Sequence, residues 1–216
     1  GGVGLGEGWL TAGARRGDAR GAEQGVVVVS MNYRLGPFGF LAHPSLAETP
    51  DGPSGNYAMR DQQLALEWVR DHIASFGGNP DDVTLFGESA GGISVCLHLA
   101  MPSSAGLFHK AISQSGLCDS GIATRDEAEA SSAEFVAAVG CNEAPDVAAC
   151  LRGLDLETIQ TNDPGADIFG TLAGSRAWWP FVDGALLPRT FREAAETDQL
   201  TLMPTLLGWN ADEGTL

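Results

Sequence analysis

The segment Phe86-Gly87-Glu88-Ser89-Ala90-Gly91-Gly92 constrains the fold of this chain more than any other. Its G-x-S-x-G pattern is typical of a sharp turn from a strand into a helix, because side chains at the flanking glycines would collide with neighbouring backbone. Residues 83–86 predict the strand and residues 90–100 the helix. The turn would expose the Ser89 hydroxyl at a helix N-terminus, where the helix dipole favours negative charge. We therefore predict that Ser89 is a nucleophile, the alternative being an incidental turn in a chain with 29 glycines.

Short apolar runs alternate with helical patterns along the rest of the chain. Residues 26–31 (Val-Val-Val-Val-Ser-Met) predict a strand buried on both faces. Residues 56–76 carry apolar side chains at helical spacing and end at the stop signal Gly77-Gly78-Asn79-Pro80. Alternating β and α units predict an α/β fold with a mainly parallel sheet, helices on both faces and working residues beyond the carboxyl ends of the strands. Further strands are expected at 110–114 and 204–208, and further helices at 124–140 and, in short pieces, at 145–160.

Charge and composition narrow the classes of function. The 216 residues carry a net charge of −16, which repels the phosphates of nucleic acids and anionic lipids, so we expect no nucleic-acid partner. The acidity is typical of a soluble surface, and the alternative is a field that attracts cationic substrates. No apolar run of about 18 residues is present, so no membrane span is expected. Neither metal-ligand spacing nor a phosphate loop appears, and we expect no metal and no cofactor.

Several motifs together resemble the type-B carboxylesterase (cholinesterase-like) family. The resemblance covers almost the whole chain in the family's order and spacing, and it implies an α/β-hydrolase fold. It also implies a serine carboxylic-ester hydrolase that acts through an acyl-enzyme on a small-molecule ester. The chain departs from the family at Ala58-Met59, where a glycine and a leucine are usual, and over residues 8–25. The motifs are residues 32–41 (Asn-Tyr-Arg-Leu-Gly-Pro-Phe-Gly-Phe-Leu), Gly55-Asn56-Tyr57, residues 60–66, Phe76-Gly77-Gly78-Asn79-Pro80, residues 87–92 and Gln114-Ser115-Gly116.

The resemblance implies an oxyanion hole built from backbone N–H groups. One donor is expected from Ala90, the residue after the nucleophile. Gly1 and Gly2 are the other expected donors, because the chain opens on a glycine-rich segment like that of the family. An alternative register uses Gly2 and Val3, and a flexible chain end is a third interpretation. Each such donor stabilises the transition state by about 3 kcal/mol.

The acidic member of the triad is expected at Glu213. The resemblance places a glutamate within an Asp-Glu-Gly sequence beyond a strand, and Asp212-Glu213-Gly214 fits that pattern. Glu213 would orient a histidine and stabilise its imidazolium form. Asp212 is the nearest alternative for the acid. In a further alternative, Glu213 has no catalytic role and is a solvated residue on a loop. The resemblance also suggests that the Ser115 hydroxyl lies near Glu213.

None of the four histidines suits the role of the base. His98 lies on the same predicted helix as Ser89, about 13 Å further along its axis. His109 lies at the amino end of its predicted strand, at the opposite edge from Ser89. His72 and His43 are expected in packing or surface positions. We therefore expect residues 1–216 to be a partial α/β-hydrolase domain, truncated at both ends, whose histidine lies downstream of Glu213.

The substrate pocket has three candidate residues, Glu88, Trp178 and Trp179. Glu88 could face a cationic substrate, and the two tryptophans could shape the acyl pocket or belong to the core. The rival function is a non-catalytic cholinesterase-like binding or adhesion domain, against which the intact serine turn argues.

Cys141 and Cys150 coincide with a short-loop disulfide of the family, although their spacing alone leaves free buried cysteines as an equal alternative. A disulfide favours an oxidising compartment, so we expect a secreted or periplasmic protein. Residues 1–8 show no signal peptide, which does not exclude one upstream. The state of Cys96 and Cys118 is left open.

Overall fold

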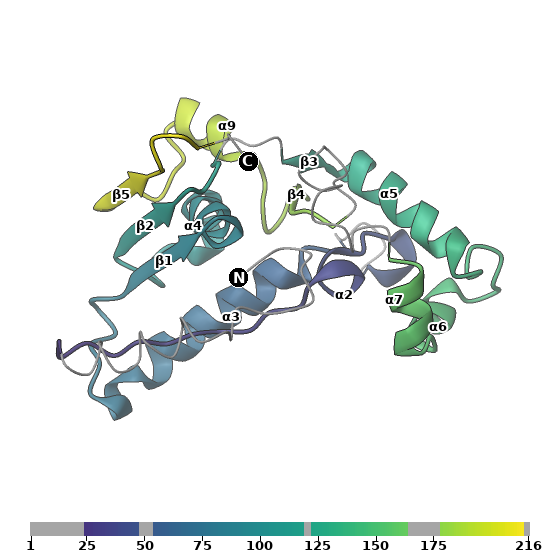
Figure 1. Cartoon of the computed structure of the whole chain (residues 1–216), viewed down its shortest axis with the longest axis horizontal. Helices are drawn as coiled ribbons and strands as arrows, with labels where there is room; N and C mark the ends of the chain where they lie inside the picture. The colour runs from purple at the N-terminus through teal and green to yellow at the C-terminus, as the bar shows by residue number, and fades with distance from the viewer. Residues whose placement is uncertain (1–23, 48–53, 119–121, 164–177, 214–216) are drawn as a thin grey trace.

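The fold is organised around a three-stranded parallel sheet with strand order β1-β2-β5 (Figure 1). The computed structural model describes residues 24–47, 54–118, 122–163 and 178–213. The strands are β1 (Thr84–Glu88), β2 (Lys110–Gln114), β5 (Thr205–Gly208) and the separate parallel pair β3 (Ala123–Thr124) and β4 (Phe181–Val182). The helices are α2 (Gly36–Phe40), α3 (Tyr57–His72), α4 (Ala90–Ala100), α5 (Arg125–Ala138), α6 (Val147–Arg152), α7 (Leu156–Thr161) and α9 (Phe191–Glu196), with 3₁₀ turns η1 (Pro44–Leu46), η2 (Ile73–Phe76) and η3 (Pro102–Ser104).

Helix α4 covers one face of the three-stranded sheet. The register pairs Leu85 of β1 with Ala111 of β2, so both side chains lie on the same face. Val95 and Leu99 of α4 belong to the same hydrophobic cluster as these two residues. Burial of this interface ties the helix that follows Ser89 to the two strands beside it. The parallel α/β arrangement that the sequence predicts is confirmed.

The opposite face of the sheet is largely exposed within the described part of the chain. Phe86, Ile112 and Leu206 form one row across the three strands, and Phe86 and Leu206 are 59% and 57% exposed. Helices on both faces were expected, but among the described residues only one face is covered. The strand expected at 26–31 is wrong: this segment forms no strand and Val26 is 57% exposed. The reason is that no backbone hydrogen bond joins it to another described segment.

Helix α3 and the 3₁₀ turn η2 together span the helical segment expected at 56–76. Asn56 precedes it in the left-handed conformation, with φ of 50°, and is fully buried. Its side-chain amide donates hydrogen bonds of 2.8 Å to the carbonyl oxygen of Phe181 and to a carboxylate oxygen of Asp183. These bonds fix the start of α3 to β4, which is far away in the sequence. At the other end, Gly77 with φ of 82° ends the helical segment, as the stop signal predicts.

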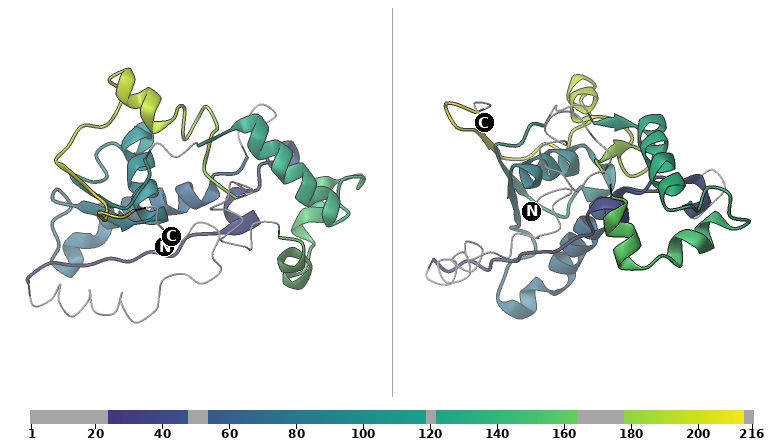
Figure 2. Two further views of the ribbon diagram at one scale, coloured as in Figure 1. Left: turned by 45° about the horizontal axis from the view of Figure 1, so that its top comes forward. Right: turned by 45° about the vertical axis from the view of Figure 1, so that its right-hand side comes forward.

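Helices α5, α6 and α7 are grouped at the opposite end of the molecule from the three-stranded sheet (Figure 1 and Figure 2). They share a buried cluster that contains Phe135, Leu151 and Ile159. The disulfide between Cys141 and Cys150 joins the loop after α5 to α6, with 5.7 Å between the Cα atoms. The pairing that the family resemblance implies is therefore present.

Candidate active site

Ser89 lies on a strained turn between β1 and α4, as the motif predicts. Its backbone has φ of 54° and ψ of −118°, a conformation that a residue with a Cβ atom adopts only where its surroundings hold it. The Ser89 N–H donates to the carbonyl oxygen of Gln114 at 2.8 Å, and its own carbonyl accepts from the N–H of Ile93 at 2.9 Å. The side chain is exposed and does not cap the helix. The hydroxyl is therefore exposed to solvent at the N-terminus of α4.

The flanking glycines are required by close backbone contacts. A Cβ atom on Gly87 would overlap the carbonyl group of Gly91, and backbone cannot move aside as a flexible side chain can. A Cβ atom on Gly92 would lie 2.8 Å from both Cα of Gly116 and Oγ of Ser113. The glycines of the motif thus allow β1, α4 and the end of β2 to approach one another.

Glu213 lies at the same edge of the sheet as Ser89. The hydroxyl of Ser115 donates to Oε2 of Glu213 at 3.1 Å, and the N–H of Asn210 donates to the same oxygen at 2.6 Å. Ser115 follows β2 and Asn210 follows β5, so both donors lie at the carboxyl ends of parallel strands. Both bonds are accepted by Glu213 rather than by Asp212. The contact between Ser115 and Glu213 that the resemblance suggests is present.

A chain of buried hydrogen bonds leads from His98 to the first residue of α4. His98 Nε2 lies 3.1 Å from Oε1 of Gln62, whose Nε2 donates to Oγ of Ser94 at 3.3 Å. Ser94 in turn donates to the carbonyl oxygen of Ala90 at 3.0 Å. An amide oxygen only accepts, so His98 carries its proton on Nε2, and its Nδ1 accepts from the Ser104 hydroxyl at 2.8 Å. The chain of bonds ends on the carbonyl of Ala90, one peptide beyond the N–H that the sequence predicts to be an oxyanion donor.

The buried environment of His98 predicts that the protein loses stability in acid. Burial lowers the pKa of His98 from 6.5 to about 4. Between these values the unfolded chain binds a proton that the folded chain does not, so stability falls as the pH falls from 6.5 towards 4. The difference of pKa corresponds to about 3 kcal/mol of unfolding free energy. In urea unfolding at pH 4 to 7.5, His98→Asn should remove this part of the pH dependence, whereas His72→Asn, at an exposed position, should retain it. Equal pH slopes for the wild type and His98→Asn would contradict the prediction.

The remaining histidines are held away from Ser89. Nδ1 of His109 accepts a hydrogen bond of 3.2 Å from the N–H of Val83, at the amino edge of the sheet. Nδ1 of His43 lies 2.7 Å from the hydroxyl of Ser45, before α3, and His72 is exposed at the end of α3. All four histidines of the sequence are among the described residues. None of these contacts brings a histidine to the carboxyl edge of the sheet, where Ser89 and Glu213 lie.

Of the three predicted oxyanion donors, the structure describes only Ala90. Ala90 is the first residue of α4, where a backbone N–H has no acceptor within the helix. Gly1 and Gly2 lie outside the described residues. Glu88 ends β1 with an exposed side chain beside Ser89. Its position is compatible with a substrate contact, which stays a prediction.

The two tryptophans occupy different environments. Trp178 is 3% exposed, and its indole packs edge-on against the ring of Phe135 at a centroid distance of 5.4 Å. Its indole N–H donates to the carboxylate of Asp163. Trp179 is half-buried and packs against two hydrophobic clusters. These contacts favour a role in the core for Trp178, and a pocket role for Trp179 stays a prediction.

Cys96 and Cys118 form a second disulfide, with 5.3 Å between their Cα atoms. The sequence alone leaves this bond open. Its only signal is an even number of cysteines, which does not specify a pairing. Across the described residues, no group of three or more His, Cys, Asp and Glu side chains is arranged to hold a metal ion. The helices of that same part of the chain include none that is both long and apolar enough to cross a membrane.

Comparison with known proteins shows the following sequence relationships. The profile of the Carboxylesterase family matches residues 6–216. Para-nitrobenzyl esterase of Bacillus subtilis (strain 168) is 41% identical over 203 residues, which are 90% of this chain and 39% of the relative. Cholinesterase of Mus musculus is 41% identical over 198 residues, 88% of this chain and 31% of the relative. Fumonisin B1 esterase of Sphingopyxis macrogoltabida is 39% identical over 194 residues, 89% of this chain and 34% of the relative.

Solved structures show the same relationship. A carboxylesterase of Geobacillus stearothermophilus superposes with a TM-score of 0.83 at 34% identity, covering 99% of this chain and 44% of that structure. A PNB esterase superposes with a TM-score of 0.80 at 35% identity, with coverage of 99% and 44%. The neighbours are esterases of the α/β-hydrolase fold. The chain spans 31% to 39% of the length of the curated relatives it matches.

Proposed function

Because the chain belongs to the carboxylesterase family, we propose that the protein it comes from hydrolyses small carboxylic esters with Ser89 as nucleophile. The observation that carries this proposal is the strained turn at Ser89, which presents an exposed hydroxyl between β1 and α4. Nothing in the packing of the turn requires a hydroxyl there. The position of Glu213 at the same edge supports its proposed role as the acid of a Ser-Glu-His triad.

In the proposed reaction, Ser89 Oγ attacks the ester carbonyl while a histidine takes its proton. The oxyanion that forms would accept a hydrogen bond from the N–H of Ala90, at the positive end of the α4 dipole. Gly1 and Gly2 are the proposed further donors. The alcohol leaves with the proton from the histidine, and water then hydrolyses the acyl-enzyme. Glu213 would hold the imidazole in position and stabilise its charged form.

We propose that the histidine comes from outside these 216 residues. This part of the proposal rests on the contacts of the four histidines, each of which packs or bonds away from Ser89. Residues 1–216 would then be part of one α/β-hydrolase domain. The two disulfides support a secreted or periplasmic location, because such bonds persist in oxidising compartments.

A fluorophosphonate probe tests the proposed function. Ser89 Oγ would attack the phosphorus, fluoride would leave, and the hydroxyl proton would pass to the histidine. We expect the full-length protein to carry the label on the peptide that contains Ser89, and Ser89→Ala to remove it. The 216-residue chain alone should show neither labelling nor turnover of p-nitrophenyl acetate.

Two outcomes would overturn parts of this proposal. An unlabelled but folded full-length protein would favour a non-catalytic binding domain. Robust turnover by the isolated chain that depends on Ser89 would show that the base lies within these 216 residues. Peptide mapping of the labelled protein by mass spectrometry distinguishes labelling at Ser89 from labelling at other nucleophiles.

A further inference from the structure

Ser89 and Ser115 both have a positive φ, of 54° and 49°. This conformation is unfavourable for a residue with a Cβ atom, so each must be held by the structure on both sides of it. On the amino-terminal side the sheet does this. The Ser89 N–H donates to the carbonyl of Gln114 at 2.8 Å, and the Ser115 N–H donates to the carbonyl of Gly208 at 2.7 Å. The segments that follow the two serines are held by a disulfide instead.

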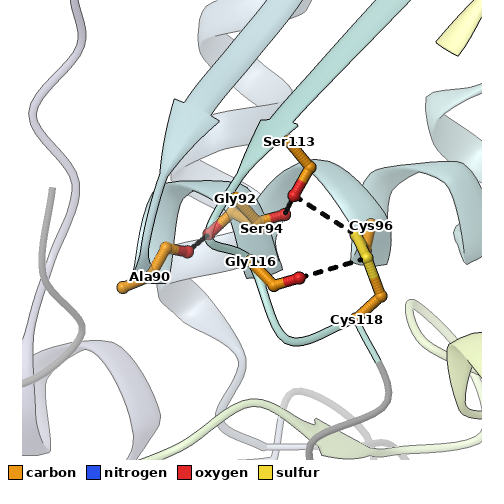
Figure 3. Close-up of a disulfide and its surroundings, with 7 residues drawn as sticks. All are labelled: Ala90, Gly92, Ser94, Cys96, Ser113, Gly116 and Cys118. Carbon is orange, nitrogen blue, oxygen red and sulfur yellow. Dashed lines mark hydrogen bonds between the residues drawn. A yellow bond between two sulfur atoms is a disulfide. The ribbon is translucent and has the colours of Figure 1, made fainter. Parts of the chain in front are cut away.

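The disulfide between Cys96 and Cys118 joins the two segments that leave these serines (Figure 3). Cys96 lies in α4, the helix that starts after Ser89, and it is fully buried. Cys118 lies shortly after Ser115, and its N–H donates to the carbonyl of Gly116 at 2.9 Å. The disulfide therefore closes the turn after β2 against the helix of the nucleophile.

The space between the two segments is filled by tight backbone contacts that the disulfide encloses. Ser113 Oγ donates to the carbonyl of Gly92 at 3.0 Å, and the sulfur of Cys96 lies 3.8 Å from the same hydroxyl oxygen (Figure 3). Gly116 lies directly against Gly92, with no room for a side chain on either residue. Such a contact has little tolerance for displacement, because a shift of either segment opens it.

We propose that Cys96 and Cys118 are positioning residues of the active site. Their disulfide holds the turn after β2 against α4, so that the Ser115 hydroxyl keeps its 3.1 Å hydrogen bond to Glu213 beside the edge that carries Ser89. Neither cysteine touches the substrate; they act through Ser115 and Glu213. The inference rests on the proposed function, because it assigns a catalytic role to Glu213.

Without the disulfide, the segment after Ser115 loses its covalent attachment to α4. Ser115 can then relax from its left-handed conformation and withdraw its hydroxyl from Glu213. The orientation of the triad would loosen, while the surfaces that bind the ester would be unchanged. Where an outer hydrogen-bond partner orients a metal-binding side chain, its loss typically lowers activity 10- to 100-fold, and the Ser115 hydroxyl would orient the Glu213 carboxylate in a similar way. We expect kcat to fall about 10-fold with KM nearly constant.

The second disulfide supplies a matched control. Cys141 is as fully buried as Cys96, but its disulfide with Cys150 lies in the α5–α6 region, away from Ser89. In the full-length protein, Cys96→Ala/Cys118→Ala should lower kcat about 10-fold, and Cys141→Ala/Cys150→Ala should leave it within about twofold. A purely stabilising role predicts equal effects of the two removals on kcat, and that result would overturn the proposal.

Two further measurements separate positioning from folding. Amide hydrogen exchange should accelerate at Ser115 in the Cys96→Ala/Cys118→Ala protein, while α5 keeps its protection; unchanged exchange at Ser115 would refute the proposal without any need for catalysis. Adding Ser115→Ala to that variant should cause no further loss of kcat, because both changes act on one contact. If the variant fails to fold, the wild-type protein is used instead. Reduction of its Cys96–Cys118 disulfide should lower kcat, and reoxidation should restore it. Peptide mapping identifies which disulfide has been reduced.

These readouts also distinguish the two proposals. A wild-type protein that the fluorophosphonate does not label would refute the proposed function. The exchange rate at Ser115 would still decide whether the disulfide holds that residue.

Discussion

Ser89→Ala should lower kcat of the full-length protein for p-nitrophenyl acetate by about 10⁵- to 10⁶-fold and leave its stability nearly unchanged. The alanine protein has no hydroxyl to attack the carbonyl, and only the oxyanion donors and substrate binding would still favour the reaction over water. The fold should be unaffected, because the Ser89 side chain is exposed and does not cap α4. Alanine also tolerates the positive φ no worse than serine, since both residues carry a Cβ atom.

Ser94→Ala is the matched control on the same helix, and it should show the opposite behaviour. Ser94 accepts from the buried amide of Gln62 and donates to the carbonyl of Ala90, so its removal leaves both groups without this partner. We expect a loss of about 1–3 kcal/mol in unfolding free energy and at most about a 10-fold loss of kcat. Urea unfolding and steady-state kinetics of both variants give the comparison. A Ser89→Ala protein that retains more than about a hundredth of the wild-type kcat would contradict the nucleophile assignment.

Local sequence patterns were sufficient to predict those elements whose structure is determined by their own residues. The bounds of β2 and α4 agree with the sequence-based expectation, because a short apolar segment and the glycine-flanked serine are both local signals. The end of the helical segment formed by α3 and η2 agrees as well, since Gly77 adopts the positive φ that a helix stop requires. The turn at Ser89 could be predicted for the same reason. Its geometry follows from which residues lack a side chain.

Features that depend on a distant partner could not be predicted in this way. Residues 26–31 have the composition of a buried strand, but a strand also needs a neighbour with which to form hydrogen bonds, and none is present among the described segments. The row that contains Phe86 is exposed for the same reason. The pairing of Cys96 with Cys118 follows from the packing of α4 against β2, which local composition does not specify.

The acidic residue is an intermediate case. The resemblance suggested both Glu213 and Ser115, but only the register of β2 and β5 places them together, 98 residues apart in the sequence. For Trp178, the sequence left two roles open and the structure favours one of them. Its sequence context allowed a pocket wall or a core residue, and its contact with Phe135 favours the core.

Glu213→Gln should lower kcat about 10³- to 10⁴-fold with a small change in KM. Glutamine has nearly the same shape as glutamate, and its amide oxygen can still accept from the Ser115 hydroxyl and the N–H of Asn210. The geometry of the loop is therefore retained, while the negative charge that would stabilise the imidazolium is lost. The effect belongs in kcat, because the charge acts when the histidine holds the proton of Ser89.

Asp212→Asn provides a control that removes the same charge from the adjacent residue. Steady-state kinetics of the full-length variants should show less than about a threefold change for Asp212→Asn, because charges exposed to solvent are strongly screened. Glu213→Asp should fall between the wild type and Glu213→Gln, since the charge remains but the carboxylate is withdrawn from Ser115. A large loss in Asp212→Asn together with an active Glu213→Gln protein would assign the acid to Asp212 instead. Equal losses in both variants would indicate that the net charge of the loop, rather than one positioned carboxylate, determines the rate.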